Sequence, residues 1–333
     1  MDKANADFWY DPFPFNILHI HFPEAFYSWN KKDRRSHSNA LESSDAFINR
    51  LKSLHGSGVK IVWTVHNIGS HEALYPDLDK RIQNALVEYA DGIILQSPSA
   101  ENIFRETFQD TADKKIRTIP HINYIDAYPN EISRSDARKS LGINEEAFLF
   151  LCIGQIRPYK GLAILFDAFE EIKKVNRDVK LIIAGKFSFG FGFSRRTSLR
   201  IKSFLSRGVT LQPRFIPDET LQILLNASDI CVFSYRNVFM SGAVILAQSF
   251  GIPVIAPRTG CLPDYVGDGL GFLYEKENPG DLADKMLMAI KSNLPELGKK
   301  AMEFQMKNDS LSIARQTVDF YNDLLLDKPA ATR

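Results

Sequence analysis

The stretch between Ser234 and Gly260 contains a helix start that could hold an anion. An apolar strand-like run at residues 230–233 leads through a polar loop to Ser241-Gly242, and a helical pattern follows at residues 243–250. A helix that begins at Ser-Gly presents free backbone N–H groups and the positive end of the helix dipole, and both favour a bound phosphate group. The alternative is an ordinary turn of an α/β fold that binds nothing.

Histidines near the ends of predicted strands are candidates for proton transfer or hydrogen bonding. His66 closes the apolar run KIVWTVH, and open parallel sheets place ligands beyond such strand ends. A neutral imidazole there can hydrogen-bond a ligand or act as a base, whereas the alternative is a structural histidine. His19 and His21 share one face of another strand and suggest a metal pair. No third ligand follows at a fixed spacing, so structural roles are favoured for both.

These residues must be positioned by alternating strands and helices. Apolar strand-like runs alternate with amphipathic helical runs along the whole chain, which predicts an α/β fold with helices covering parallel sheets. We expect strands at residues 16–21, 60–66, 92–96, 115–119, 148–153, 180–184, 209–212, 230–233 and 253–256. We expect helices at residues 44–54, 79–89, 161–175, 218–226, 243–250, 281–291 and 310–325, with Ile313, Phe320, Tyr321 and Leu324 as the buried stripe of the last.

Length and charge pattern suggest two domains. The chain has 333 residues and is 44% hydrophobic, which is enough for two ordinary cores. We interpret the charged segment at residues 133–147 as a linker between two halves that face a cleft. The expected division is an N-terminal domain at 1–140, a C-terminal domain at 141–309, and a helix and tail at 310–333 that pack back on the N-terminal domain.

Composition excludes several classes of protein. The 41 Lys and Arg residues balance the 40 Asp and Glu residues, so no global field favours nucleic acid. The three cysteines imply no disulfide framework, and the acidic start of the chain predicts no signal peptide, hence a cytoplasmic location. The uncharged run at residues 237–257 is long enough to cross a bilayer, but Gly251 and Pro253 interrupt it. We therefore predict a core helix followed by a core strand.

Five segments of the second half match a known family in order and spacing. They are GQIRPYKG at 154–161, LIIAG at 181–185, VTLQPRFIPDETL at 209–221, ASDICVFSYR at 227–236 and GIPVIAPRTGCLPDYV at 251–266. The second half therefore resembles the C-terminal domain of GT-B glycosyltransferases of the group 1 type, which use nucleotide-sugar donors. The resemblance implies two Rossmann-like parallel-sheet domains facing a cleft.

The resemblance also implies a donor site. Its residues would be Gly154, Arg157, Lys160, Phe215, Ser241 and Gly242. Arg157 and Lys160 would grip the diphosphate, which suits the planar fork of Arg and the point charge of Lys, and the alternative is two ordinary loop cations. Phe215 would border the nucleobase or else belong to the core. His66 would face the donor sugar as the catalytic residue.

The chain departs from the family at two acidic positions. Where these enzymes usually carry two Glu residues separated by seven others, this sequence has Val238 and Leu246. In relatives one Glu lies near the donor sugar and the other holds the ribose hydroxyls. Their replacement leaves the nucleotide, the sugar contacts and the retention or inversion of the anomeric configuration open.

Together these features predict a metal-independent hexosyltransferase without cofactors. It would move a sugar from a nucleotide diphosphate to a hydroxyl of a glycan or lipid-linked saccharide in bacterial-type polysaccharide biosynthesis. The alternatives are a non-catalytic glycosyltransferase-like subunit that binds a nucleotide sugar or a protein partner, and a nucleotide-sugar epimerase. Aromatic residues mixed with cations at 186–208 and 26–35 suggest peripheral contact with the inner membrane face, or else solvated loops and a charged helix face.

Overall fold

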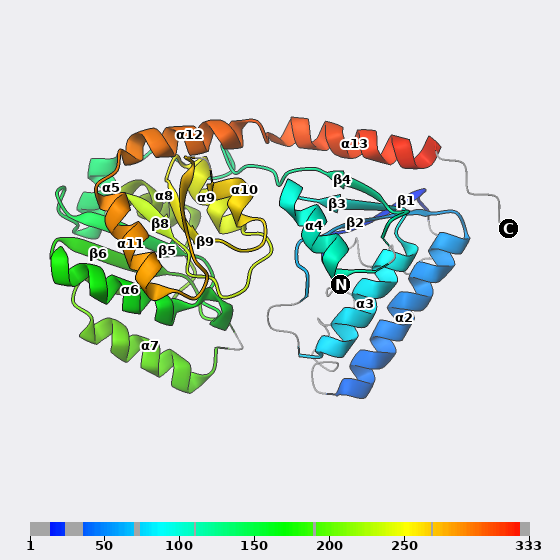
Figure 1. Cartoon of the computed structure of the whole chain (residues 1–333), viewed down its shortest axis with the longest axis horizontal. Helices are drawn as coiled ribbons and strands as arrows, with labels where there is room; N and C mark the ends of the chain where they lie inside the picture. The colour runs from blue at the N-terminus through cyan, green and yellow to red at the C-terminus, as the bar shows by residue number, and fades with distance from the viewer. Residues whose placement is uncertain are drawn as a thin grey trace. The chain divides into compact units, whose positions relative to one another are not determined.

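The computed structural model describes residues 14–23, 36–69, 74–109, 111–188, 191–267 and 269–326. The chain forms two compact units (Figure 1). Unit 1 comprises Met1–Pro120 and Leu311–Arg333, and unit 2 comprises His121–Ser310. Each unit contains a parallel β-sheet and helices, which confirms the predicted α/β class with two parallel sheets. None of the helices among the described residues has the length and apolar character needed to cross a membrane.

The described part of unit 1 contains a four-stranded parallel sheet in the order β1-β2-β3-β4. Its strands are β1 (Ile17–Ile20), β2 (Lys60–Thr64), β3 (Gly92–Leu95) and β4 (Lys115–Thr118). Its helices are α2 (His37–Gly56), α3 (Pro76–Tyr89), α4 (Pro98–Thr107) and α13 (Ser310–Leu326). All four strands fall within the predicted ranges. Helix α2 begins earlier than predicted because Ala40 extends its buried stripe by a turn.

Helix α13 packs on the sheet of unit 1 although it lies at the far end of the sequence. Phe320 and Leu324 are buried against apolar side chains of β2 and β3, and Ile313 and Tyr321 pack beside them. This confirms the predicted buried stripe of the helix. Figure 1 shows α13 on one side of the sheet and the neighbouring helices α2 and α3 on the other.

The described part of unit 2 contains a six-stranded parallel sheet in the order β10-β9-β8-β5-β6-β7. Its strands are β5 (Phe148–Ile153), β6 (Val179–Ala184), β7 (Val209–Gln212), β8 (Ile230–Val232), β9 (Val254–Pro257) and β10 (Gly271–Tyr274). Its helices are α5 (Arg134–Leu141), the 3-10 turn η3 (Pro158–Lys160), α6 (Leu162–Val175), α7 (Phe193–Leu205), α8 (Asp218–Ala227), α9 (Gly242–Ser249), α10 (Leu262–Val266), α11 (Pro279–Ile290) and α12 (Leu294–Met306). Strand β10 was not predicted, because it is a short edge strand whose residues are mostly half-buried.

The charged segment at residues 133–147 is not a linker, contrary to our interpretation. Residues Arg134–Leu141 form helix α5 within unit 2, and the Ser133 hydroxyl caps its start by accepting from the Asp136 N–H at 3.1 Å. The helix ends at Gly142 in the left-handed conformation. Because the segment is highly charged, the sequence did not indicate that one of its residues, Arg138, has a fully buried side chain.

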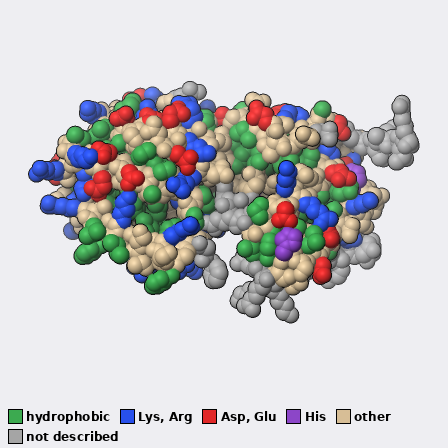
Figure 2. Space-filling view, turned by 60° about the horizontal axis from the view of Figure 1, so that its bottom comes forward, with side chains coloured by type: hydrophobic (Ala, Val, Ile, Leu, Met, Phe, Trp, Pro, Cys, Tyr) green, Lys and Arg blue, Asp and Glu red, His purple; other side chains and the backbone are tan. Residues whose placement is uncertain are grey.

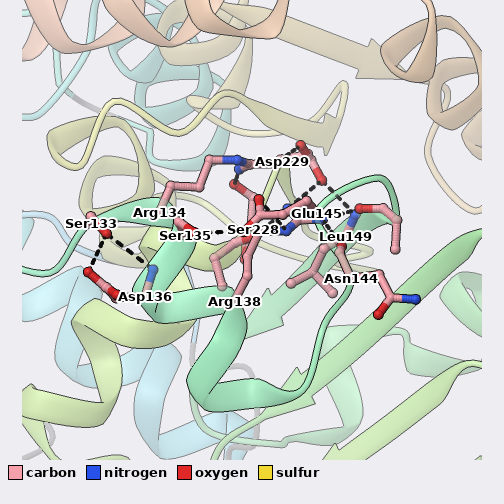
Figure 3. Close-up of polar contacts among 12 residues, drawn as sticks. Ser133, Arg134, Ser135, Asp136, Arg138, Asn144, Glu145, Leu149, Ser228 and Asp229 are labelled. Atoms are coloured by element: carbon pink, nitrogen blue, oxygen red, sulfur yellow. Dashed lines mark hydrogen bonds and ion pairs between the residues drawn. The ribbon is translucent and has the colours of Figure 1, made fainter.

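Arg138 joins α5 to the central strands of unit 2 (Figure 3). Its Nη1 donates to the carbonyl of Ala227 at 2.9 Å and to Oδ2 of Asp229 at 3.4 Å, and its Nη2 donates to the carbonyl of Ala147. The same Oδ2 of Asp229 accepts from the Leu149 N–H of β5 at 2.7 Å. One buried guanidinium thus connects the helix, the start of β5 and the turn that leads into β8.

Candidate functional site

The order of strands in unit 2 marks where a ligand site is expected. Strands β5 and β8 lie side by side, and from them the sheet grows outward in opposite directions, through β6 and β7 on one side and β9 and β10 on the other. In open parallel sheets, ligands bind beyond the carboxyl ends of the strands at this switch point. The loops that follow β5 and β8 are the two loops that the sequence motifs selected.

The loop after β5 is fixed against the residues that follow β8. The Ser234 hydroxyl donates to the carbonyl of Lys160 at 2.8 Å, and the Arg236 N–H donates to the carbonyl of Tyr159 at 2.8 Å. Gly161 has φ +63°, and a Cβ there would lie 2.0 Å from the Ser234 carbonyl oxygen. Only glycine fits this close approach, so the GQIRPYKG motif ends where the loop must touch its neighbour.

Lys160 is buried in this loop, with 7% of its surface exposed. Its Nζ donates to the phenol oxygen of Tyr235 at 3.0 Å and lies 4.6 Å from the centre of that ring. A Cβ on Gly154 would come within 3.1 Å of the same Nζ. Burial lowers the pKa of Lys160 because it disfavours the charged ammonium. Within the described ranges, no Asp or Glu forms an ion pair with Lys160.

Tyr235 connects Lys160 to the helix start at Ser241. Its phenol oxygen lies 2.7 Å from the Ser241 hydroxyl, which is buried and accepts from the Val244 N–H at 3.4 Å as the N-cap of α9. Since Lys160 donates to the phenol oxygen, the phenol hydrogen is available to Ser241. Burial raises the pKa of Tyr235, so the phenol stays neutral. The structure therefore brings two predicted site residues together through a tyrosine that the motifs did not single out.

A second tyrosine lies beside the helix start. A Cβ on Gly242 would lie 3.1 Å from the phenol oxygen of Tyr124. The backbone N–H of Tyr124 donates to the hydroxyl of Ser249 at 3.0 Å, at the other end of α9. Burial raises the pKa of the Tyr124 phenol, which therefore stays protonated at neutral pH. Tyr124 precedes every motif of the second half, so no sequence signal pointed to it.

Arg157 lies in the same loop as Lys160 but in a different environment. Its Nε donates to the side-chain oxygen of Gln155 at 2.7 Å. It lines a cavity of about 330 Å³ between the start of α6 and helix α7, to which Arg195, Lys202 and Arg236 also contribute. Four cationic side chains therefore border one cavity, whereas Lys160 is not part of its lining.

The remaining predicted residues of unit 2 differ in exposure. Phe215, in the loop after β7, is 72% exposed, so the alternative that it belongs to the core is wrong. Val238 is buried and Leu246 is half-buried. The two positions at which the family resemblance implies Glu are therefore occupied by apolar side chains that offer no hydrogen bond to a ligand.

His66 lies beyond the end of β2 in unit 1 and contacts His21. Nε2 of His66 and Nδ1 of His21 are 3.0 Å apart, and the ring of Phe22 stacks on His66 with centroids 4.4 Å apart. A hydrogen bond between two imidazole nitrogens needs one donor and one acceptor, so at least one of the two rings is neutral. No group of three or more His, Cys, Asp or Glu side chains within the described ranges is arranged to hold a metal ion.

His19 is a structural residue of unit 1. Its Nε2 is hydrogen-bonded to the Thr64 hydroxyl at 2.7 Å, and its Nδ1 to the Tyr321 hydroxyl of α13 at 2.5 Å. Burial, followed by the neighbouring His21 and His66, lowers the pKa of His19 from 6.5 to about 3. The imidazole is therefore neutral at physiological pH.

This lowered pKa predicts a dependence of stability on pH. The unfolded chain binds a proton at His19 with a pKa near 6.5 and the folded chain only near 3, so protons favour unfolding between these values. The contribution of His19 is complete above pH 6.5 and is lost as the pH falls toward 3, by up to about 1.4 kcal/mol per pH unit. Urea unfolding of unit 1, followed by tryptophan fluorescence at pH values between about 5 and 6.5, measures this effect. The lower limit of about pH 5 avoids most of the titration of the carboxylates.

The matched control is His19→Asn, which cannot titrate. We expect the stability of this variant to vary less with pH than that of the unchanged protein over the same window. Equal slopes would mean that His19 does not carry the effect.

Comparisons with known proteins bear on this site. Residues 133–307 match the family described as "Glycosyl transferases group 1". The GDP-mannose:glycolipid 4-beta-D-mannosyltransferase of Xanthomonas campestris pv. campestris is 24% identical over 283 residues, which cover 84% of this chain and 72% of that protein. The D-inositol 3-phosphate glycosyltransferase 2 of Catenulispora acidiphila is 27% identical over 301 residues, which cover 81% of this chain and 66% of that protein.

Solved structures resemble the fold. Sucrose-phosphate synthase from Thermosynechococcus elongatus has a TM-score of 0.73 at 19% identity, and the match covers 94% of this chain and 75% of that one. Anabaena HepE in complex with UDP and glucose has a TM-score of 0.73 at 18% identity, and the match covers 93% and 78% of the two chains.

Proposed function

Because the chain belongs to the group 1 glycosyltransferase family, we propose that it transfers a hexose from a nucleoside diphosphate donor to a hydroxyl of a glycan or lipid-linked saccharide. The relatives named above support this proposal, since one is a GDP-mannose:glycolipid mannosyltransferase and HepE was crystallised with UDP and glucose. We assign the reaction to polysaccharide biosynthesis in the cytoplasm.

The observation that carries the proposal is the buried ammonium of Lys160. Burying a charge is costly unless an opposite charge or strong hydrogen bonds compensate it. Its described partners are a neutral phenol and aromatic ring faces, and no carboxylate of the described residues pairs with it. The diphosphate of the donor is the anion that would complete this site, and a perturbed cation at a sheet switch point is typical of a functional site.

The chemistry requires stabilisation of a leaving group. In the transfer, the bond between the anomeric carbon and the diphosphate oxygen breaks, a bond to the acceptor oxygen forms, and the acceptor proton passes to a base. The diphosphate gains negative charge as it leaves. We propose that Lys160, Arg157 and the N–H groups at the start of α9 neutralise that charge, with Tyr235 holding Lys160 and Ser241 in place. A metal ion is then unnecessary for this step.

We propose roles for two further residues, one in each unit. The exposed ring of Phe215 is suited to stacking on a nucleobase, because an aromatic ring in a loop offers its face to solvent. His66 is proposed as the catalytic residue that hydrogen-bonds the sugar or accepts the acceptor proton. Its contact with His21 would tune which nitrogen is protonated.

A second candidate function is a subunit that binds a nucleotide sugar without transferring it. The specific observation in its favour is that the apolar residues Val238 and Leu246 stand where the family resemblance implies two carboxylates. Under this alternative, donor binding persists and turnover is absent with any acceptor.

The release of nucleoside diphosphate from a panel of UDP-, GDP- and ADP-sugars, in buffer containing EDTA, tests the proposal. We expect one nucleotide to support slow hydrolysis or transfer, and His66→Ala to lower kcat about tenfold, the effect of losing about 1.4 kcal/mol of transition-state stabilisation. Binding of the nucleoside diphosphate by the variant should be unchanged.

Binding without turnover would favour the non-catalytic subunit, sugar isomerisation without acceptor would indicate an epimerase, and turnover that EDTA abolishes would contradict the metal-independent mechanism.

A further inference from the structure

Helix α7 exposes large apolar side chains to solvent. Phe193 is 86% exposed, Phe204 89% and Leu205 74%, and Ile201 is 54% exposed. Exposing one apolar residue is ordinary, but these four lie on a single short helix. Figure 2, in which the lower side of Figure 1 comes forward, shows hydrophobic side chains beside Lys and Arg on this side of unit 2.

The exposed apolar residues form one continuous face of the helix. Phe193, Ile201 and Phe204 are separated by multiples of three or four residues and therefore lie along the same side, with Leu205 at its margin. Thr197 lies between them on that side. The opposite side is the buried one, and it carries Leu199 and Ser203. Helix α7 thus turns its apolar face outward, the reverse of an ordinary surface helix.

Cations lie on both sides of the apolar face. By helical position, Arg200 flanks it on one side, Arg195 and Lys202 flank it on the other, and Arg207 follows the C-terminal end. Lys202 is held by Asp167 of α6 at 2.8 Å, and Arg196 donates to the carbonyl of Ser188 at 2.9 Å. The sequence from residue 186 to residue 208 is KFSFGFGFSRRTSLRIKSFLSRG. It contains six Lys and Arg residues and no Asp or Glu.

We propose that α7 docks unit 2 on an anionic lipid bilayer. A helix with aromatic and aliphatic residues on one side and Arg and Lys at its margins lies in the plane of the interface, where the rings enter the acyl boundary and the cations contact lipid phosphates. The charge pattern favours a lipid bilayer over a second copy of the chain as the partner of α7. A symmetric contact between two α7 helices would bring the arginines of both copies together, and their like charges would repel. This assignment does not depend on the donor site.

The second candidate segment for membrane contact, at residues 26–35, lies outside the described residues. Helix α7 alone therefore carries the proposal, and its variants must account for the binding.

Co-sedimentation of the full chain with vesicles tests the docking. One set of vesicles contains phosphatidylcholine and phosphatidylglycerol in equal parts, and the other contains phosphatidylcholine only. We expect binding to the first set, weakening as salt rises, and little binding to the second. The double variant Phe193→Ser/Phe204→Ser should lower the partition coefficient at least about tenfold, because two rings no longer leave water.

A second pair of variants separates charge from apolar contact. Arg200→Glu/Arg207→Glu should abolish the preference for anionic vesicles. The matched controls are Met306→Ser and Lys299→Glu on α12, which are also exposed and should bind like the unchanged protein. Thermal unfolding verifies that each variant is folded.

Three outcomes would overturn the proposal. They are the absence of binding to anionic vesicles, binding that survives both double variants, and self-association in sedimentation velocity that disappears in Phe193→Ser/Phe204→Ser without any binding to lipid. The last would assign the helix to a contact between copies of the chain.

Discussion

Lys160→Met is expected to lower kcat/KM for the nucleotide sugar by about a hundredfold to a thousandfold, the effect of removing one preorganised charge from a developing anion. The unfolding free energy should stay the same or rise, because Met keeps the apolar stem and removes a buried charge. Among the described residues, that charge donates a hydrogen bond only to the phenol of Tyr235. Loss of activity together with retained stability is the signature of a binding role. If Lys160 were only structural, its replacement would instead lower the stability while the remaining folded protein kept its activity.

Two further variants sharpen this test. Tyr235→Phe keeps the ring beneath Lys160 and removes only the oxygen that joins it to Ser241, so activity should fall less than in Lys160→Met. Lys299→Met, on the surface of α12, is the matched control and should be as active as the unchanged protein. Unchanged kcat/KM in Lys160→Met would remove the lysine from the mechanism.

Arg138→Ala is expected to destabilise unit 2 by about 3–5 kcal/mol, because it leaves Asp229 and several carbonyl groups without their buried partner. The matched control is Arg134→Ala. Arg134 pairs with the other oxygen of the same Asp229 at 2.6 Å but is about half exposed, so its loss should cost less than about 1 kcal/mol. Both substitutions lie in α5 (Figure 3), and only the loss of the buried Arg138 should lower the stability of unit 2 strongly.

The measurement must report on unit 2. Trp9, Trp29 and Trp63 all belong to the chain segment of unit 1, so tryptophan fluorescence would miss the effect. Hydrogen exchange of amides in β5 and β8 reads the stability of unit 2 directly. Equal protection in Arg138→Ala and Arg134→Ala would show that the buried network contributes no more than the exposed ion pair.

Much of the fold could be predicted because the strands are buried and continuous. The predicted strands of both units were found with ends shifted by a residue or two, since uninterrupted runs such as FLFLCI have one interpretation in an α/β chain. Two elements in charged segments were not predicted. Arg138 and its helix α5 lie in a run that reads as a linker. The segment that contains α7 reads either as a patch for membrane contact or as solvated loops and a charged helix face, because its apolar residues lie on the solvent side.

The candidate site was only partly visible in the sequence. The motif around Lys160 and the Ser-Gly helix start were recognisable because each is local. Their connection was not, because Lys160 and Tyr235 are separated by 75 residues and meet only when β5 and β8 pair. Tyr124 has no motif at all. It reaches the start of α9 because its backbone is held by Ser249.

We infer that the Lys160, Tyr235 and Ser241 cluster binds the diphosphate of a nucleotide donor. Calorimetric titration with UDP, GDP and ADP, and with the corresponding nucleosides, tests it most directly. We expect the unchanged protein to bind one nucleoside diphosphate far more tightly than its nucleoside, and Lys160→Met to lose that difference while Lys299→Met keeps it. Equal affinity of the unchanged protein and Lys160→Met for the diphosphate, or no binding of any of the three nucleotides, would rule out this diphosphate site.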